Sequence, residues 1–295
     1  MKNHVLCFGE VLWDTFTDGK KPGGAPMNVA QHLAQQGHEV SLVSRIGKDN
    51  SGKKLAEFLK KNDLYGKHVQ RDDELPTCEV TVKLDDSNQA TYTIPQPVSW
   101  DNIKVENGLK KHARKAAAIV YGSLASRSKK TRNTLQTLLD ETTALKIFDV
   151  NLRAPHYNLE NIDILAAKAN VVKMNEEEAS LLVGGHADQL KNNIQEFQKK
   201  YHAKTIVVTR GDKGAMVWHD EKFYEHPGFS VNVVDTVGAG DAFLATLISG
   251  ILKDRPMDLV LEKACAIGAY VAGKRGANPE YDKDEIKTIK GIAAA

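Results

Sequence analysis

The residue pattern best suited to chemistry lies between Val233 and Phe243, where an apolar stretch runs into Gly238-Ala239-Gly240 and then directly into a helix-like segment. The backbone N–H groups of a helix's first turn have no partner within the helix, and glycines let a ligand approach them closely. The helix dipole adds about half a positive charge at this end. The pattern therefore predicts an anion hole suited to a phosphate.

Asp241 follows this turn at once, and a carboxylate beside a phosphate site needs a function because it repels the ligand. A general base that accepts the proton of an attacking hydroxyl is one such function. An ordinary residue of a helix N-terminus, favoured by the dipole, is the alternative, and both stay open at this point. A dinucleotide fingerprint is disfavoured because Phe243 stands where its third glycine would lie.

A second candidate site begins with the glycine pair Gly23-Gly24, which Pro26 follows at the expected start of a helix. Backbone donors and the amide of Asn28 would face outward together there, and Asp14 would be their carboxylate partner. Amides and carboxylates of this kind suit a ligand with several hydroxyl groups. Taken singly, each feature is more typical of an ordinary loop.

Three polar clusters follow expected strands: Asp149 to Arg153, Asn175 to Glu178, and Thr209 to Gly214. The carboxyl ends of parallel strands meet at one edge of a sheet, which is where open α/β folds bind ligands. Each cluster alone is consistent with a helix cap or a turn. Their coincidence at one edge favours a shared site.

A P-loop-like segment at 47–54 matches GxxxxGK[ST] except that Lys54 replaces the Ser or Thr whose hydroxyl binds Mg²⁺. Asp49 in the same loop would face the phosphates unfavourably. A P-loop is therefore disfavoured.

Short apolar runs alternate with longer amphipathic segments, a pattern typical of a mostly parallel sheet flanked by helices, so the predicted fold class is α/β. Expected strands cover residues 4–8, 39–46, 117–121, 145–150, 170–174 and 205–209, and expected helices cover residues 27–36, 53–61, 129–139, 176–183, 188–200, 242–252 and 258–273. No repeat or linker divides the chain, so we expect a single domain over residues 1–295.

Two stretches depart from this alternation. Residues 11–17 continue with strand character after the first strand, and residues 77–84 alternate before a turn at 85–88 and a returning strand at 90–94. This pattern predicts a hairpin outside the main sheet, because alternation marks a sheet with one wet face. A lid over a ligand and a decorative surface hairpin both stay open.

Composition excludes several classes of protein. The 40 basic and 38 acidic residues give a net charge of +2 without a long basic tract, so nucleic acid is not an expected partner. Cys7, Cys78 and Cys265 lie far apart, which disfavours disulfides and a zinc site and fits a reducing cytoplasm. No stretch approaches the ~20 apolar residues of a membrane helix, and the first residues do not form a signal peptide.

The motifs GGAPMNVA at 23–30 and DTVGAGDAF at 235–243 resemble those of the PfkB, or ribokinase-like, carbohydrate kinases, and the likeness runs from about residue 4 to residue 283. The resemblance implies a doubly wound α/β domain with a small β-sheet lid, whose strands lie at about 11–18 and 76–95. It implies ATP-dependent phosphorylation of a sugar hydroxyl, with Mg²⁺ accompanying ATP.

The resemblance also implies roles for individual residues. Asp241 corresponds to the catalytic base, and Gly238, Ala239 and Gly240 would provide the anion-hole N–H groups. Sugar contacts would come from Asp14, Gly24 and Asn28, with Gly23 shaping the turn and Arg153 near the sugar or its phosphate. ATP contacts would come from Asn175, Thr209, Gly211, Gly214, Gly240 and Asn278. Glu178 would hold Mg²⁺ through water, and Asp235 would belong to a monovalent-cation site.

Departures from the ribokinase pattern bear on the substrate. Ala25 and Leu12 stand where ribokinases commonly carry Lys and Asn, which argues against ribose. GGAPMN and DVNLR resemble fructokinases, so phosphorylation of a primary hydroxyl of fructose is predicted. A 2-keto-3-deoxygluconate kinase is the alternative because Arg153 would also suit a carboxylate, and ribokinase and a non-catalytic sugar- or nucleotide-binding regulator follow.

Two further points stay open. Val237, Lys274 and Glu280 depart from the ribokinase pattern at the cation site, so K⁺ dependence is undecided. Relatives commonly form a homodimer through the lid, and Tyr92 and Ile94 would either cover the sugar or face a partner subunit.

Overall fold

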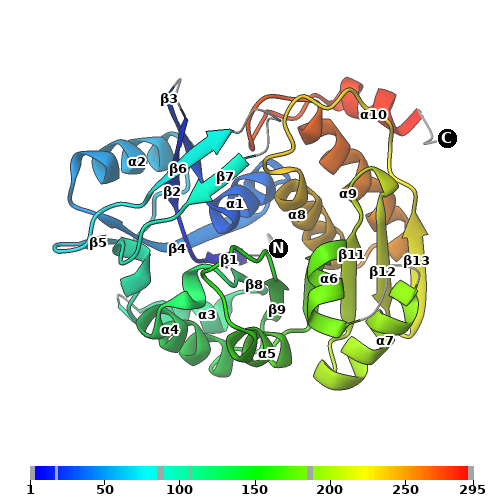
Figure 1. The fold of residues 1–295 in the computed structure, drawn as a ribbon, viewed down its shortest axis with the longest axis horizontal. Helices are drawn as coiled ribbons and strands as arrows, with labels where there is room; N and C mark the ends of the chain where they lie inside the picture. The colour runs from blue at the N-terminus through cyan, green and yellow to red at the C-terminus, as the bar shows by residue number, and fades with distance from the viewer. Residues whose placement is uncertain (1–3, 17–18, 85–89, 107, 185–188, 292–295) are drawn as a thin grey trace.

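The computed structural model describes residues 4–16, 19–84, 90–106, 108–184 and 189–291 of the 295-residue chain (Figure 1). The turn expected at 85–88 lies outside the described residues.

A large sheet of nine strands, in the order β13-β12-β11-β10-β9-β8-β1-β4-β5, forms the centre of the molecule. The seven strands from β11 to β5 in this order pair in parallel with their neighbours. The strand β12 pairs antiparallel with both β11 and β13. The strands are β1 (His4–Phe8), β4 (Glu39–Gly47), β5 (Val69–Asp72), β8 (Ala118–Gly122), β9 (Leu145–Asp149), β10 (Val171–Asn175), β11 (Thr205–Thr209), β12 (Ala215–His219) and β13 (Lys222–His226). The predicted α/β class with a mostly parallel sheet is confirmed.

Helices cover both faces of this sheet because side chains alternate along each strand. Leu6 and Phe8 of β1 belong to one core cluster together with residues of α4, α5 and α7, whereas Val5 and Cys7 belong to a second cluster with residues of α1, α2, α8 and α9. These two groups of helices lie on opposite sides of the sheet (Figure 1). The helices are α1 (Ala25–Gln35), α2 (Asn50–Lys61), α3 (Leu109–Lys115), α4 (Lys129–Asp140), α5 (Leu159–Ala167), α6 (Glu176–Val183), α7 (Leu190–Tyr201), α8 (Ala239–Ile251), α9 (Met257–Ala272) and α10 (Lys283–Gly291).

A second, four-stranded sheet stands apart from the main one and has the order β3-β2-β6-β7 (Figure 1). Its strands are β2 (Leu12–Phe16), β3 (Gly19–Gly23), β6 (Glu79–Leu84) and β7 (Ala90–Thr93). The predicted hairpin outside the main sheet is confirmed as the antiparallel pair β6–β7. The sequence did not predict β3, whose Gly-Lys-Lys-Pro-Gly run lacks strand-forming residues; Pro22 is tolerated because β3 is an edge strand.

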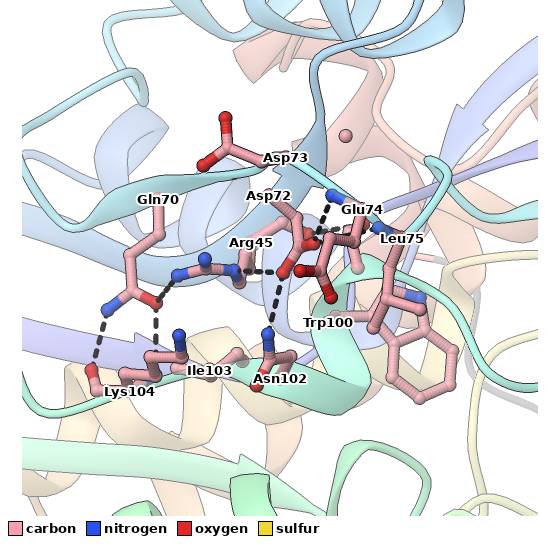
Figure 2. Close-up of polar contacts among 12 residues, drawn as sticks. Arg45, Gln70, Asp72, Asp73, Glu74, Leu75, Trp100, Asn102, Ile103 and Lys104 are labelled. Carbon is pink, nitrogen blue, oxygen red and sulfur yellow. Dashed lines mark hydrogen bonds and ion pairs between the residues drawn. The ribbon is translucent and has the colours of Figure 1, made fainter.

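Buried polar contacts anchor the chain that enters this small sheet (Figure 2). Arg45 on β4 donates to Asp72 at 2.5 Å and to Gln70 at 3.0 Å, and Asp72 also accepts the backbone N–H of Leu75 and the amide of Asn102, both at 2.8 Å. Burial acts to raise the pKa of Asp72, but these hydrogen bonds outweigh it and hold the pKa well below its usual range. The base of the small sheet is thereby attached firmly to the main sheet.

The chain that leaves β7 is anchored in a similar way. Arg127 donates to both carboxylate oxygens of Asp101, at 2.9 and 2.8 Å, and to the carbonyl of Pro95 at 2.7 Å. Its guanidinium also lies 4.1 Å from the ring centre of Trp100. Both connections of the β6–β7 hairpin are therefore fixed, which sets the position of the hairpin.

The P-loop-like segment has a structural explanation. Asp49 caps α2 and accepts the N–H of Gly52 at 2.7 Å, and it also accepts the N–H of Thr77 at 2.7 Å. The carboxylate thus occupies the place that a phosphate would take in a P-loop, which supports the interpretation that this segment binds no nucleotide.

None of the helices among the described residues is long and apolar enough to span a membrane. Cys7, Cys78 and Cys265 are buried free thiols. The absence of a disulfide between them agrees with the sequence interpretation.

His32 connects α1 to the chain that follows α9. Its side chain is fully buried, with Nε2 2.9 Å from the carbonyl oxygen of Ala277 and Nδ1 2.8 Å from the hydroxyl of Tyr281. Burial lowers the pKa of His32 to about 4, although the contact with Ala277 acts in the opposite direction. The folded state therefore holds a neutral imidazole at this point.

We expect this histidine to make the protein acid-sensitive. The stability associated with neutral His32 is fully present above pH 6.5, the pKa of an unfolded histidine, and is lost as the pH falls toward 4. At pH 5 the loss amounts to about 2 kcal/mol. Urea unfolding of the wild type and of His32→Gln at pH 7 and pH 5 measures this loss. Between the two pH values, the free energy of unfolding should fall by about 2 kcal/mol less in the variant than in the wild type. An equal fall in both proteins would contradict the assignment of a neutral, buried His32.

Candidate active site

A cavity of about 380 Å³ lies between the carboxyl ends of the main-sheet strands and the small sheet. Glu10 follows β1, Arg153 follows β9, and Asn175 ends β10, so the polar strand ends meet at one edge as predicted. Leu12, Val80 and Ile94 line the opposite side from the small sheet, at β2, at β6 and just after β7. The cavity therefore has a polar wall and an apolar one.

The predicted glycine pair is required by close packing. A Cβ on Gly23 would collide with the carboxylate of Asp14, and a Cβ on Gly24 would lie 2.5 Å from the carbonyl oxygen of Glu10. Gly24 also has φ +116°, which side chains rarely adopt. The pair thus leaves room for Asp14 at the cavity, where burial raises the pKa of this carboxyl to about 6 and the charge of Arg153 opposes the rise.

Asn28 and Asp241, which the sequence placed in separate motifs, are in direct contact. The Asn28 amide nitrogen donates to Asp241 at 2.8 Å, and Asn28 Oδ1 accepts from the amide nitrogen of Asn278 at 2.8 Å. Asn28 lies on α1 and Asp241 in the first turn of α8, so this contact joins the two candidate motifs in one site.

Burial and neighbouring groups shift the pKa of Asp241. Burial raises its pKa to about 6, and the negative charge of Asp149 adds to the rise. The hydrogen bond from Asn28 and the positive charges of Lys173 and Arg153 limit it. A carboxylate with this pKa is mostly ionised at pH 7 and still accepts a proton readily, as a general base requires.

The glycine turn before Asp241 is shaped by its neighbours. Gly238 has φ +80°, and a Cβ there would lie 2.6 Å from Ala277. Of the predicted anion-hole donors, Ala239 already donates its N–H to the carbonyl of Thr236 at 3.3 Å, while Gly238 and Gly240 line the cavity. This arrangement leaves Gly238 and Gly240 as the donors best placed for an anion.

Lys173 is a site residue that sequence reasoning missed. It lies on β10, buried, and its ammonium group pairs with Asp149 at 3.0 Å. A Cβ on Gly240 would lie 3.3 Å from this nitrogen, so the ammonium is next to the predicted anion hole. Burial acts to lower the pKa of Lys173, but the charges of Asp149, Glu178 and Asp241 raise it, so the side chain stays positive. A charged residue within an apolar strand was the available signal.

Glu10 is a second residue that was missed. Its side chain is buried at the cavity, and Oε2 has no hydrogen-bond partner among the described residues. Burial raises its pKa to about 7; the charge of Arg153 opposes this rise, and Asp241 and Asp149 add to it. Its place directly after the first strand, at the edge where the other polar clusters lie, could have identified it.

A second cavity, of about 670 Å³, adjoins the first and shares Asn175, Thr209, Thr236 and Gly240 with it. The predicted ATP contacts that line this second cavity are Asn175, Thr209, Gly211, Gly214 and Gly240. Apolar groups, including Val233, Phe243, Ala269 and Ala272, line it as well. Asn278 is not among the residues that line either cavity; its amide contacts Asn28 instead.

The two predicted metal-site carboxylates are held by backbone groups. Glu178 accepts the N–H of Asn175 at 2.9 Å and that of Leu152 at 2.7 Å, and Asp235 accepts those of Val237 at 3.0 Å and Gly276 at 3.1 Å. The described residues contain no group of three or more His, Cys, Asp or Glu side chains suited to a metal ion. Mg²⁺ bound mainly by phosphates and water needs fewer protein ligands, and the water-mediated contact of Glu178, which is not among the residues lining either cavity, stays a prediction.

Arg153 and Ile94 are both at the first cavity. The Arg153 side chain is exposed, and its Nη1 donates to the carbonyl of Leu152 at 3.0 Å. Ile94 is buried and lines the cavity, whereas the side chain of Tyr92 lies outside the described residues.

The sequence matches the pfkB family of carbohydrate kinases over residues 2–284, nearly the whole chain. The protein belongs to the PfkB family. It is therefore a carbohydrate kinase, and the glycine turn at the cavity and the buried carboxylate beside it agree with that membership.

Proteins similar to this chain match it over nearly its whole length. The fructokinase of Salmonella typhimurium is 30% identical over 94% of this chain and 95% of its own. The structure of a sugar kinase from Pyrococcus horikoshii in complex with ATP is 28% identical and has a TM-score of 0.79, covering 95% of this chain and 96% of that one. A 2-dehydro-3-deoxygluconokinase from Thermotoga maritima, at 20% identity, has a TM-score of 0.84 over 98% of this chain and 99% of that one and shares the fold.

Gly23→Ala tests the packing of Asp14. Because the new methyl group collides with the Asp14 carboxylate, we expect the KM for the sugar to rise about tenfold or more, the effect of losing one well-placed charged hydrogen bond. Gly66→Ala is the matched control, since a Cβ there has nothing within 4 Å. Steady-state kinetics at saturating ATP measures both variants, and an unchanged KM in Gly23→Ala would exclude Asp14 as a sugar contact.

Proposed function

We propose that this PfkB kinase transfers the γ-phosphoryl group of ATP to a primary hydroxyl of fructose. The observation that carries the proposal is the position of Asp241, hydrogen-bonded to Asn28 at the first cavity and beside Gly240, which lines both cavities. The first cavity would hold the sugar and the second would hold ATP. The proton acceptor and the anion hole then lie where the two substrates meet.

In this mechanism Asp14, Gly24 and Asn28 orient the sugar through its hydroxyl groups. Asp241 accepts the proton of the attacking hydroxyl as its oxygen forms a bond to the γ-phosphorus. The bond from that phosphorus to the oxygen bridging it to the β-phosphate breaks, and ADP leaves. The backbone N–H groups of Gly238 and Gly240 stabilise the negative charge on the transferred group.

Lys173 would add to this stabilisation, because its ammonium group lies beside Gly240 and stays positive. Mg²⁺ accompanying ATP would neutralise phosphate charge, with Glu178 holding one of its water ligands and Asn175 nearby at the same strand end. Asp235 is the proposed carboxylate of a K⁺ site that joins the 235–237 and 276 segments.

The small sheet would act as a lid over the sugar. Leu12, Val80 and Ile94 present apolar side chains to the first cavity, so a bound sugar would be shielded from water on that side. Exclusion of water favours transfer to the sugar over hydrolysis of ATP. The same sheet is the proposed surface for a homodimer.

Fructose is favoured over ribose because Leu12 and Ala25 line the cavity as apolar side chains where ribokinases commonly carry Asn and Lys. A relative at 30% identity over nearly the whole chain is named a fructokinase. The second candidate is a 2-keto-3-deoxygluconate kinase, which the exposed guanidinium of Arg153 at the cavity favours, since arginine pairs well with a carboxylate.

Asp241→Asn tests the general base. The amide cannot accept the hydroxyl proton, so we expect kcat to fall by about 10²- to 10⁴-fold while the affinity for ATP changes little. Lys53→Ala, at an exposed position in the P-loop-like segment, is the control and should leave kcat unchanged. A loss of only a few-fold in Asp241→Asn would rule out the general-base role, and an inactive Lys53→Ala would restore the P-loop interpretation.

The substrate is tested by ADP release with Mg-ATP and fructose, ribose, 2-keto-3-deoxygluconate, adenosine or glucose, with and without K⁺. We expect the highest kcat/KM with fructose. Turnover on the keto acid alone, lost in Arg153→Gln, would assign the protein as the acid-sugar kinase instead. Binding of a sugar by calorimetry without phosphate transfer would favour a non-catalytic regulator.

A further inference from the structure

Asn278, in the segment after α9, is linked to Asp241 through the side chain of Asn28. Asn278 donates its amide N–H to Asn28 Oδ1 at 2.8 Å, and Asn28 in turn donates to Asp241 at 2.8 Å. The three side chains form a relay from a loop at residue 278, through α1, to the first turn of α8. Asn278 itself is not among the residues lining either cavity.

The loop that carries Asn278 is held firmly against α1. His32 contacts the carbonyl of Ala277 at 2.9 Å, and Gln35 donates to the carbonyl of Pro279 at 3.2 Å and accepts the N–H of Tyr281 at 3.2 Å. These contacts flank Asn278 on both sides in the chain. The donor that faces Asn28 therefore has a defined position.

The direction of each hydrogen bond follows from the chemistry of the groups. An ionised Asp241 can only accept, so Asn28 must present its N–H₂ group to it. The carbonyl oxygen of Asn28 then faces Asn278, which must donate. If Asn28 turned its amide over, its carbonyl oxygen would face the Asp241 carboxylate, and two acceptors would oppose each other.

We propose that Asn278 is a positioning residue that fixes the orientation of the Asn28 amide and thereby keeps Asp241 ready to accept the proton of the sugar hydroxyl. This inference rests on the proposed role of Asp241 as general base and extends it to a residue outside both cavities. It differs from the expected contact between Asn278 and ATP, which would act on nucleotide binding.

The hydrogen bond from Asn28 and the charges around Asp241 together set the pKa of Asp241. Asp149 and Glu10 are acidic groups near Asp241, and Lys173 and Arg153 are the positive groups that oppose them. The hydrogen bond from Asn28 acts with the positive groups to limit the rise of the Asp241 pKa to about 6. Loss of its correct orientation should raise that pKa further.

Asn278→Asp is the sharpest test. The new carboxylate can only accept, so it takes the Asn28 N–H and turns the Asn28 carbonyl toward Asp241. We expect the acidic limb of the kcat profile to move up by about one pH unit, which lowers kcat about fivefold at pH 6 and about twofold at pH 7, with recovery at higher pH. Asn278→Ala should shift the limb in the same direction by less, and Asn278→Gln should restore part of the wild-type profile.

Gln35→Ala is the matched control, because Gln35 holds the same loop to α1 without touching Asn28. It should leave the acidic limb in place. If kcat fell equally at every pH in Gln35→Ala and in the Asn278 variants, Asn278 would be only a packing residue. If the Asn278 variants raised the KM for ATP and left the acidic limb of the kcat profile in place, Asn278 would be an ATP contact. Either result would overturn the proposal.

A second readout does not depend on turnover. Carbon-13 NMR of labelled aspartate carboxyls, with Asp241 assigned from Asp241→Asn, follows the titration of Asp241 directly. The upward shift that Asn278→Asp causes in the wild-type background should largely disappear in the Asn28→Ala background, where the double variant is compared with Asn28→Ala alone, since the relay then lacks its middle member. A shift that persists in full would come from the added charge alone and would refute the relay, whereas a wild type inactive on all sugars would refute the proposed function without affecting this titration.

Discussion

The hydrogen bond from Asn28 to Asp241 is the contact on which the arrangement of the site depends. It joins side chains 213 positions apart in the chain, one on α1 and the other in the first turn of α8. Because α1 and α8 pack together on the same face of the main sheet, this contact joins the GGAPMNVA motif to the helix that follows the glycine turn. The two candidate motifs thus come together in one candidate site only through packing of the helices that carry them.

Around this contact the structure balances buried charge. The Lys173–Asp149 pair is almost completely excluded from water, with side chains 9% and 5% exposed. A buried pair of this kind adds little net stability, and removal of one member costs about 3–5 kcal/mol. In the proposed function its value lies instead in placing a positive charge beside Gly240, where the transferred phosphoryl group would carry negative charge, while burial raises the pKa of Asp241 to about 6.

Much of the fold could be predicted because its strands and helices carry local signals. The run Thr205-Ile206-Val207-Val208 is apolar and β-branched and forms β11, and Glu176 to Val183 forms the helix its pattern indicates. β3 has no such signal: Gly19 to Gly23 becomes a strand because β2 offers it a hydrogen-bonding partner. The antiparallel strands β12 and β13 and the short helix α3 were also not predicted.

The sequence by itself determined the α/β alternation, the glycine turn before Asp241 and the glycine pair before α1, because helix starts, strand periodicity and the absence of Cβ are local properties. Only the tertiary structure decided that Glu10 and Lys173 belong to the site and that Asn278 reaches Asn28. The reason is physical: burial and the partner of a charge or an amide depend on which segments pack together, and residues 28 and 278 acquire their relation only when α1 and the loop after α9 are brought into contact.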